Sequence, residues 1–124
     1  MYITIDERDS RPLYQQIVDE IKELIARGEL REGSSLPPVR QVSSDLGVNL
    51  NTVAFAYRRL QSDGLIKVRH GSGAIVRSRT AAAKTDEQLR SQLRSALTQL
   101  VLAGLKRTEI RALISEELNS LMRE

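Results

Sequence analysis

Apolar residues at spacings of three and four predict a first helix near the beginning of the chain. Pro12 suits the first turn of a helix, and the pattern ends at Arg27-Gly28, where glycine can adopt the left-handed conformation that closes many helices. We therefore expect a helix over residues 13–27, preceded by a short strand or extended arm at residues 2–5. The buried stripe of this helix consists of Leu13, Ile17, Ile21, Leu24 and Ile25.

Two shorter amphipathic segments follow, separated by a turn. The first stops at Gly47, and the second begins with Asn49 as its N-cap and ends at Asp63-Gly64. Two short helices joined by a glycine-containing turn are typical of a helix-turn-helix. The predicted buried positions are Val39, Val42 and Leu46 in the first segment and Val53, Ala56, Tyr57 and Leu60 in the second.

An alternating segment after the third helix predicts a β-ribbon. Over residues 65–69, Ile66 and Val68 share one face and Lys67 and Arg69 share the other, which is the pattern of a half-buried strand. Residues 70–73 form the turn and residues 74–77 return as the second strand. A helix-turn-helix followed by such a ribbon is a winged helix-turn-helix, which we expect to occupy residues 1–78.

The last part of the chain, residues 79–124, is predicted to form a hairpin of two helices. Thr85 and Gln88 have the spacing of a capping box, the helix that follows ends at Gly104, and Thr108 opens the last helix. Two helices alone bury only part of their apolar stripes, so we expect a second copy of the chain to cover them. The predicted dimer interface comprises Leu89, Leu93, Leu97, Leu100, Ile110, Leu113, Ile114 and Leu118.

The composition narrows the chemistry that 124 residues of mainly helical fold can carry. There is no cysteine, and His70 is the single histidine, so neither a thiolate zinc site nor a histidine cluster can form. The sequence shows no paired carboxylates and no nucleophile next to a base, so we expect neither an enzyme nor a cofactor nor a bound metal. No run of 18 apolar residues occurs and the start of the chain is acidic, which predicts a cytoplasmic protein without a membrane span.

Charge is distributed unevenly along the chain. The net charge is +3, but residues 1–35 carry five Lys or Arg against eight Asp or Glu, whereas residues 36–80 carry seven against two. The middle third is therefore the part that favours a polyanionic partner. Arg58 is a candidate phosphate contact within it. An alternative is a winged-helix protein-interaction module that docks through the tail, and the excess of basic residues argues against this alternative.

Several separated motifs occur in one order and with regular gaps: Leu-Pro-Pro-Val-Arg at residues 36–40, Leu-Gly-Val-Asn-Leu-Asn-Thr-Val at 46–53, Tyr-Arg-Arg-Leu at 57–60 and His-Gly-Ser-Gly at 70–73. Together they resemble the DNA-binding domain of the GntR family of bacterial transcription regulators, over residues 11–77. The short helical tail resembles that of the YtrA subfamily.

The resemblance implies roles for individual residues in binding double-stranded DNA. Arg40 would read guanine in the major groove, and Asn49, Leu50, Asn51 and Thr52 would face base edges and phosphates. His70 and Gly71 would enter the minor groove. A guanidinium can bond both guanine acceptors at once, which agrees with the first role. Leu50 and Ala54 depart from the resemblance, because many relatives carry arginine there.

The resemblance also implies a function. We expect a homodimeric repressor that binds an inverted-repeat operator, controls a neighbouring transporter operon and is released by a small-molecule effector. The residues themselves indicate neither the effector nor the regulated genes.

Overall fold

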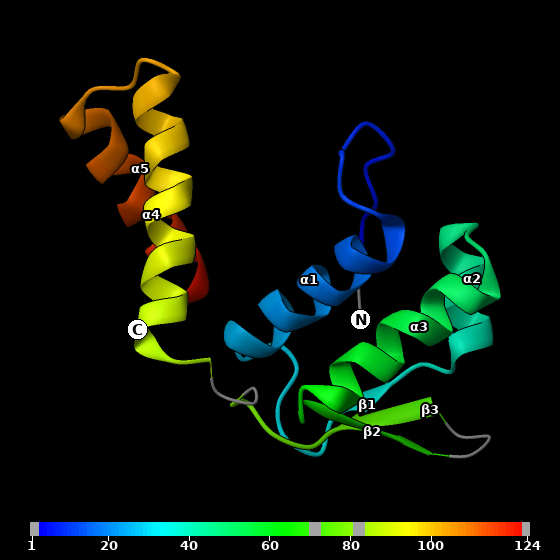
Figure 1. Ribbon diagram of the computed structural model, residues 1–124. Helices are drawn as coiled ribbons and strands as arrows, with labels where there is room; N and C mark the ends of the chain where they lie inside the picture. Colours follow the sequence, from blue (N-terminus) through cyan, green and yellow to red (C-terminus); the bar gives the residue numbers. More distant parts are fainter. Residues whose placement is uncertain (1–2, 70–72, 81–83, 123–124) are drawn as a thin grey trace. The chain divides into compact units, whose positions relative to one another are not determined.

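The computed structural model describes residues 3–69, 73–80 and 84–122 and divides the chain into two compact units, residues 1–82 and 83–124 (Figure 1). The predicted class, mainly helical with a small sheet, is confirmed, and the helices lie where the apolar stripes place them. The first unit contains α1 (Leu13–Ala26), β1 (Ser35–Leu36), α2 (Val39–Leu46), α3 (Leu50–Ser62), β2 (Ile66–Arg69) and β3 (Gly73–Val76), and the second contains α4 (Asp86–Leu102) and α5 (Arg107–Leu121).

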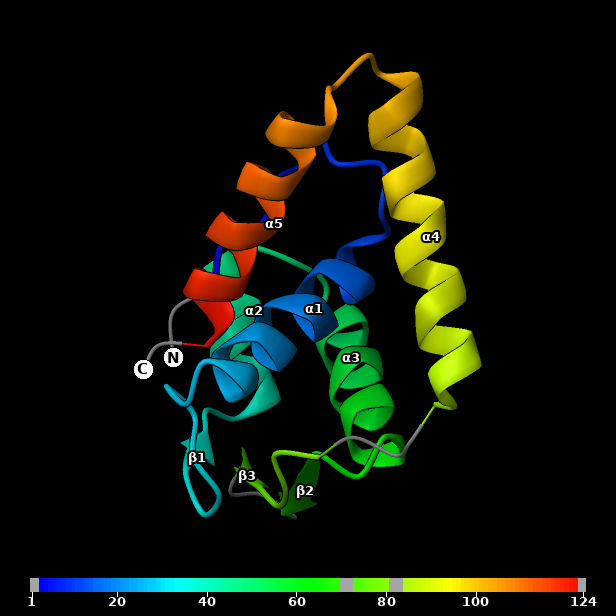
Figure 2. The same cartoon turned by 90° about the vertical axis from the view of Figure 1, so that its left-hand side faces the viewer.

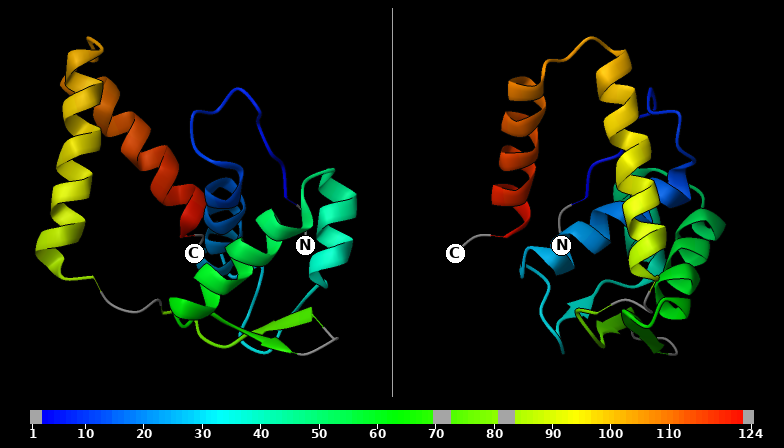
Figure 3. Two further views of the ribbon diagram at one scale, coloured as in Figure 1. Left: turned by 45° about the vertical axis from the view of Figure 1, so that its right-hand side comes forward. Right: turned by 60° about the vertical axis from the view of Figure 1, so that its left-hand side comes forward.

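The core of the first unit lies between its three helices and one face of its sheet (Figures 2 and 3). The central helix is α3, which packs against α1, α2 and β2. Tyr57 on α3 is the largest fully buried side chain. The other predicted stripe residues of α3, Val53, Ala56 and Leu60, are also buried. The helical period therefore identified the core face of α3 correctly.

The sheet has three strands rather than the two of the predicted ribbon. Its order is β1-β3-β2 and both pairings are antiparallel, with Ser35 opposite Ile75 and Ile66 opposite Val76. The extra strand, β1, lies in a segment that reads as a turn in the sequence. It is two residues long and forms by pairing with the free edge of β3. Its partner lies about 40 residues further along the chain, so the local sequence does not predict it.

Gly73 permits the close approach of β3 to the segment after β1. Its φ angle is +80°, and a Cβ atom at this position would lie 2.5 Å from the carbonyl oxygen of Leu36 and 3.2 Å from the nitrogen of Pro38. Only glycine combines this conformation with this spacing. The segment that Gly73 touches leads directly into α2, so the sheet and the helix-turn-helix are coupled through backbone contacts.

Several predictions of local detail differ from the structure: Leu13, predicted in the buried stripe, is 36% exposed, and Gly73, predicted in the turn, begins β3. Of the two alternatives for residues 2–5, a strand or an extended arm, no strand is present over the described residues 3–5, and Ile3 and Ile5 pack against the core. Val68 is 38% exposed although Ile66 is buried, because β2 runs beyond the core at that end. The first helix ends at Ala26 with Arg27 as its cap, one residue earlier than predicted. The last helix begins at Arg107, because the N–H of Lys106 donates to Glu109 Oε1 and sets the cap there.

The second unit is an α-helical pair whose apolar side chains remain largely outside any core. The predicted capping box is confirmed: the N–H of Gln88 donates to Thr85 Oγ1 and the N–H of Thr85 donates to Gln88 Oε1. Neither α4 nor α5 contains a fully buried residue. The large apolar residues that stay exposed in this unit are Leu89, Leu93, Val101, Leu102, Leu113, Ile114, Leu118 and Met122.

Candidate nucleic-acid interface

The turn between α2 and α3 is held by backbone geometry and one side-chain hydrogen bond. Gly47 closes α2 where the sequence predicts the helix to stop, in the left-handed conformation with a φ angle of +68°. The hydroxyl of Ser43 donates to the carbonyl oxygen of Val48 at 2.6 Å. These contacts determine where α3 starts relative to α2, so they determine how the residues of the two helices are presented together.

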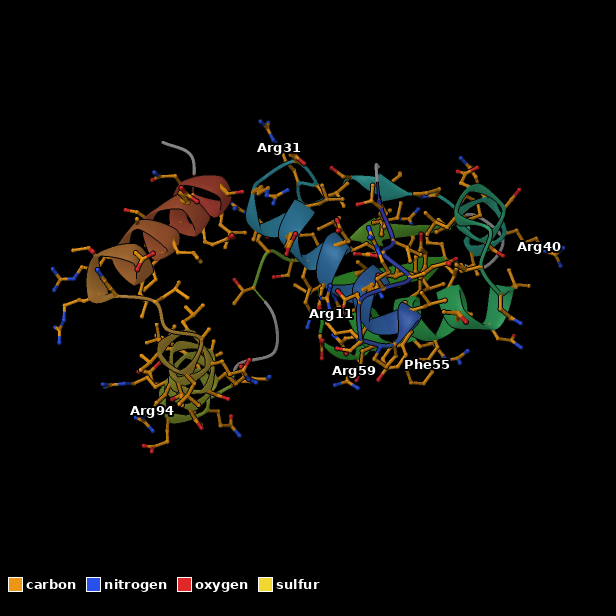
Figure 4. All side chains as sticks on the ribbon, turned by 90° about the horizontal axis from the view of Figure 1, so that it is seen from above. Arg11, Arg31, Arg40, Phe55, Arg59 and Arg94 are labelled. Carbon is orange, nitrogen blue, oxygen red and sulfur yellow. The ribbon has the colours of Figure 1, made fainter. Side chains whose placement is uncertain are left out.

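The beginning of α2 is anchored to α3 by a buried tyrosine. The hydroxyl of Tyr57 donates to the carbonyl oxygen of Pro37 at 2.7 Å, and burial raises the pKa of this hydroxyl, so it stays protonated and acts as a donor. Arg40 follows three residues after Pro37 and is exposed. In Figure 4 its side chain extends outward from α2 into open space.

The first turn of α3 presents short polar side chains and one leucine. Asn49 caps the helix: its Oδ1 accepts the backbone N–H of Asn51 at 2.8 Å. The cap uses the oxygen of the Asn49 side chain, so the amide nitrogen is the group that can donate to a ligand. Asn51 is exposed, Thr52 is half-buried and Leu50 is 39% exposed. A capped helix start with such groups suits hydrogen bonding to phosphates and base edges.

Phe55 is exposed on α3, outside the buried stripe of that helix, and lies beside Tyr14 of α1. Its ring meets that of Tyr14 edge to face, with 4.7 Å between the ring centres. The guanidinium carbon of Arg58 lies 5.9 Å from the centre of the Phe55 ring, within reach of a cation–π interaction. Arg58 itself remains exposed. An open groove of about 530 Å³ adjoins this cluster, lined by Pro12, Leu13, Tyr14, Asn51, Thr52 and Phe55.

The ribbon is tied to α3 and carries two exposed cations. Gln61 Oε1 accepts the backbone N–H of Val68 at 2.7 Å, and Lys67 and Arg69 are exposed on β2. In Figure 1 the start of α3, helix α2 and the joined ends of β2 and β3 lie on the same side of the first unit. The predicted contacts His70 and Gly71 lie outside the described residues.

The Lys and Arg side chains of residues 36–80 are available to bind a ligand, except for that of Arg79. Arg79 folds back, and its Nη2 donates to the carbonyl oxygen of Ala26 at 2.8 Å, so this residue closes the end of α1. Among the residues that the structure describes, the remaining six form no ion pair with Asp or Glu. They are Arg40, Arg58, Arg59, Lys67, Arg69 and Arg77, and all are exposed.

Part of the acidic charge of the first unit is neutralised internally. Arg11 pairs with Asp9 and Asp19, and its hydrogen bonds lower the pKa of the Asp9 carboxyl group. Lys22 pairs with Asp63 at 3.0 Å, at the end of α3. The helix α3 itself contains no acidic residue between Leu50 and Ser62. Exposed cations on α3, α2 and β2, together with the absence of acid from α3, are suited to a polyanion.

The described part of the chain offers little for other classes of site. Over residues 3–69, 73–80 and 84–122 no group of three or more His, Cys, Asp or Glu side chains is arranged to hold a metal ion. Among these same residues, no helix combines the length and the apolar character needed to cross a bilayer.

Comparison with known proteins places this geometry among regulators of transcription. Residues 13–76 match the family described as bacterial regulatory proteins, gntR family. The chain is 33% identical over 118 residues to the HTH-type transcriptional repressor YtrA of Bacillus subtilis (strain 168), which covers 92% of this chain and 90% of that protein. A transcriptional antiterminator from Listeria monocytogenes EGD-e superposes with a TM-score of 0.84 and 31% identity, covering 100% of this chain and 95% of that one. The DNA-binding domain of AraR in complex with operator ORX1 matches with a TM-score of 0.54 and 25% identity, over 61% of this chain and 95% of that one.

Proposed function

Because the chain belongs to the gntR family of bacterial regulatory proteins, whose members bind DNA to regulate transcription, we propose that it is a homodimeric repressor that binds an inverted-repeat operator. The observation that carries this proposal is the exposed, unpaired Arg40 beside the capped first turn of α3. The AraR complex supports the same mode of binding, since a related domain there is bound to an operator.

In the proposed complex the first turn of α3 lies in the major groove. Arg40 donates two hydrogen bonds to the O6 and N7 atoms of a guanine, which is the pairing that a guanidinium makes best. Asn49, Asn51 and Thr52 contact base edges and phosphates, and Leu50 lies among them. Arg58, beside the Phe55 ring, contacts a phosphate without regard to sequence. The resemblance extends the proposal to His70 and Gly71 in the adjacent minor groove.

We propose that the second unit joins two copies of the chain. Five of the eight residues proposed for the interface are exposed within one copy, whereas Leu97, Leu100 and Ile110 are half-buried, and a symmetric partner that presents the same surface would bury them. The residues proposed for this interface are Leu89, Leu93, Leu97, Leu100, Ile110, Leu113, Ile114 and Leu118. A two-fold dimer of helix-turn-helix units requires half-sites about 34 to 36 Å apart, or a multiple of that spacing.

The domain boundaries that we propose are residues 1–78 for DNA binding and 79–124 for dimerisation. The similarity to the YtrA repressor supports the repressor assignment. From the resemblance to its subfamily we further propose a cytoplasmic regulator that controls a neighbouring transporter operon and is released by a small-molecule effector. Loss of operator binding on addition of fractionated small metabolites would identify that effector.

The proposal is tested by selecting bound sequences from random duplexes and measuring affinity for the selected duplex as salt rises. We expect an inverted repeat to emerge, and we expect the logarithm of the affinity to fall with the logarithm of salt by about 0.9 for each phosphate contacted. RNA of the same sequence is the control and should bind weakly. Recovery of unselected sequences, or elution from duplex DNA at low salt, would instead indicate a protein-interaction module.

A further inference from the structure

One apolar side chain at the proposed interface is not explained by the core. Leu50 is the first residue of α3, and 39% of its surface is exposed. It belongs neither to the buried cluster nor to the partly buried residues that pack against that cluster. A single exposed leucine needs no partner of its own. Leu50 is set apart by its position, because it lies in the first turn of α3, next to the capping Asn49 and the exposed Asn51.

The residues that share this side of α3 define the chemistry of that contact. Leu50, Ala54 and Arg58 are four positions apart, so they follow one another along one face of the helix. Leu50 is large, Ala54 is small and half-buried, and Arg58 is cationic and exposed. This face therefore presents one apolar side chain at Leu50, a small side chain at Ala54 one turn later, and a positive charge at Arg58 one turn further on.

An occupant of this face must combine negative charge with a small apolar group. The helix contains no acidic residue, and exposed cations lie on α3 itself and on α2 and β2, which pack against it, so the charge favours a polyanion over an apolar peptide. In the major groove of duplex DNA the apolar group is the C5 methyl of thymine, and the phosphates lie at the groove edges. Duplex DNA therefore supplies both the negative charge and the small apolar group that this face requires.

We propose that Leu50 packs against the C5 methyl group of one thymine in each operator half-site, with Ala54 leaving the space in which the methyl group sits. This inference rests on the proposed function and adds to it a base preference that comes from an apolar contact. The selected half-site should then contain a thymine within a few base pairs of the guanine contacted by Arg40.

The test replaces each thymine of the selected operator in turn by deoxyuridine, which removes the methyl group and keeps every hydrogen-bonding group. Burial of one methyl group stabilises by about 0.8 kcal/mol, so we expect affinity in fluorescence anisotropy to fall about fourfold at one position of a half-site. The Leu50→Ala variant should bind thymine and uracil duplexes alike. Leu50→Met, which keeps an apolar side chain of similar size, should retain the preference for thymine.

Leu102→Ala is the control, because Leu102 is an exposed leucine of α4 that belongs neither to the proposed DNA contacts nor to the proposed dimer interface. This variant should keep the full difference between thymine and uracil. If no uridine substitution weakens binding while Arg40→Ala still relaxes the choice of guanine, the leucine contact is refuted and the proposed function stands. The contact is likewise refuted if Leu50→Ala still distinguishes uracil. If no sequence is bound selectively, both proposals fail together.

Discussion

Substitution of Gly73 by alanine should destabilise the first unit far more than the same substitution at Gly47. Both glycines have a positive φ angle, +80° and +68°, so each alanine variant incurs about 1–2 kcal/mol of left-handed strain. The two positions differ in the room available for a side chain. Nothing lies within 4 Å of a Cβ atom placed at Gly47, whereas a Cβ atom at Gly73 would lie 2.5 Å from the carbonyl oxygen of Leu36. Backbone must move to relieve that clash, and we expect about 1–3 kcal/mol of additional cost at Gly73.

Urea unfolding followed by tyrosine fluorescence measures this difference directly. The chain has no tryptophan, and its three tyrosines, Tyr2, Tyr14 and Tyr57, all lie in the first 82 residues, so the signal reports the first unit alone. Gly47→Ala is the internal control for strain without a clash. Equal shifts in the free energy of unfolding for the two variants would refute the claim that close backbone approach, rather than conformation alone, requires glycine at position 73.

Three further predictions concern single contacts. Tyr57→Phe removes the hydrogen bond to the Pro37 carbonyl and should cost about 1 kcal/mol of stability in a denaturation followed by circular dichroism; an unchanged midpoint would show that this bond does not hold α2. Thr85→Ala breaks the capping box with Gln88 and should speed amide exchange in the first turn of α4, at a cost of about 1 kcal/mol, while Thr85→Ser should behave as the parent. Arg58→Ala should weaken binding to selected and unselected duplexes equally and lower the salt slope by about 1, whereas a loss confined to one sequence would contradict a phosphate contact.

The helix-turn-helix was predictable because its signals are local. A stripe of apolar residues with a period of 3.6, a glycine that ends one helix and an asparagine that begins the next all act within a few residues of each other. Gly47 and Asn49 accordingly occupy the predicted cap positions. The same local chemistry explains why the Thr85 capping box was found.

Features that depend on distant parts of the chain could not be predicted. The strand β1 has only two residues, too few to show an alternating pattern that would predict its pairing with β3. The exposure of Val68 depends on where the core ends beneath β2. The helical period placed Phe55 outside the core but could not show that Tyr14 of α1 would pack against it. Charge counting assigned Arg79 to the basic surface, whereas its side chain binds the end of α1.

The central claim is that Arg40 selects a base, and one titration tests it most directly. Four duplexes that differ only in the base pair at the selected guanine are titrated with the parent protein and with Arg40→Ala. The parent should prefer guanine, and the variant should lose about 1–3 kcal/mol on the guanine duplex and bind all four nearly equally. A variant that keeps both the affinity and the preference of the parent would contradict the account.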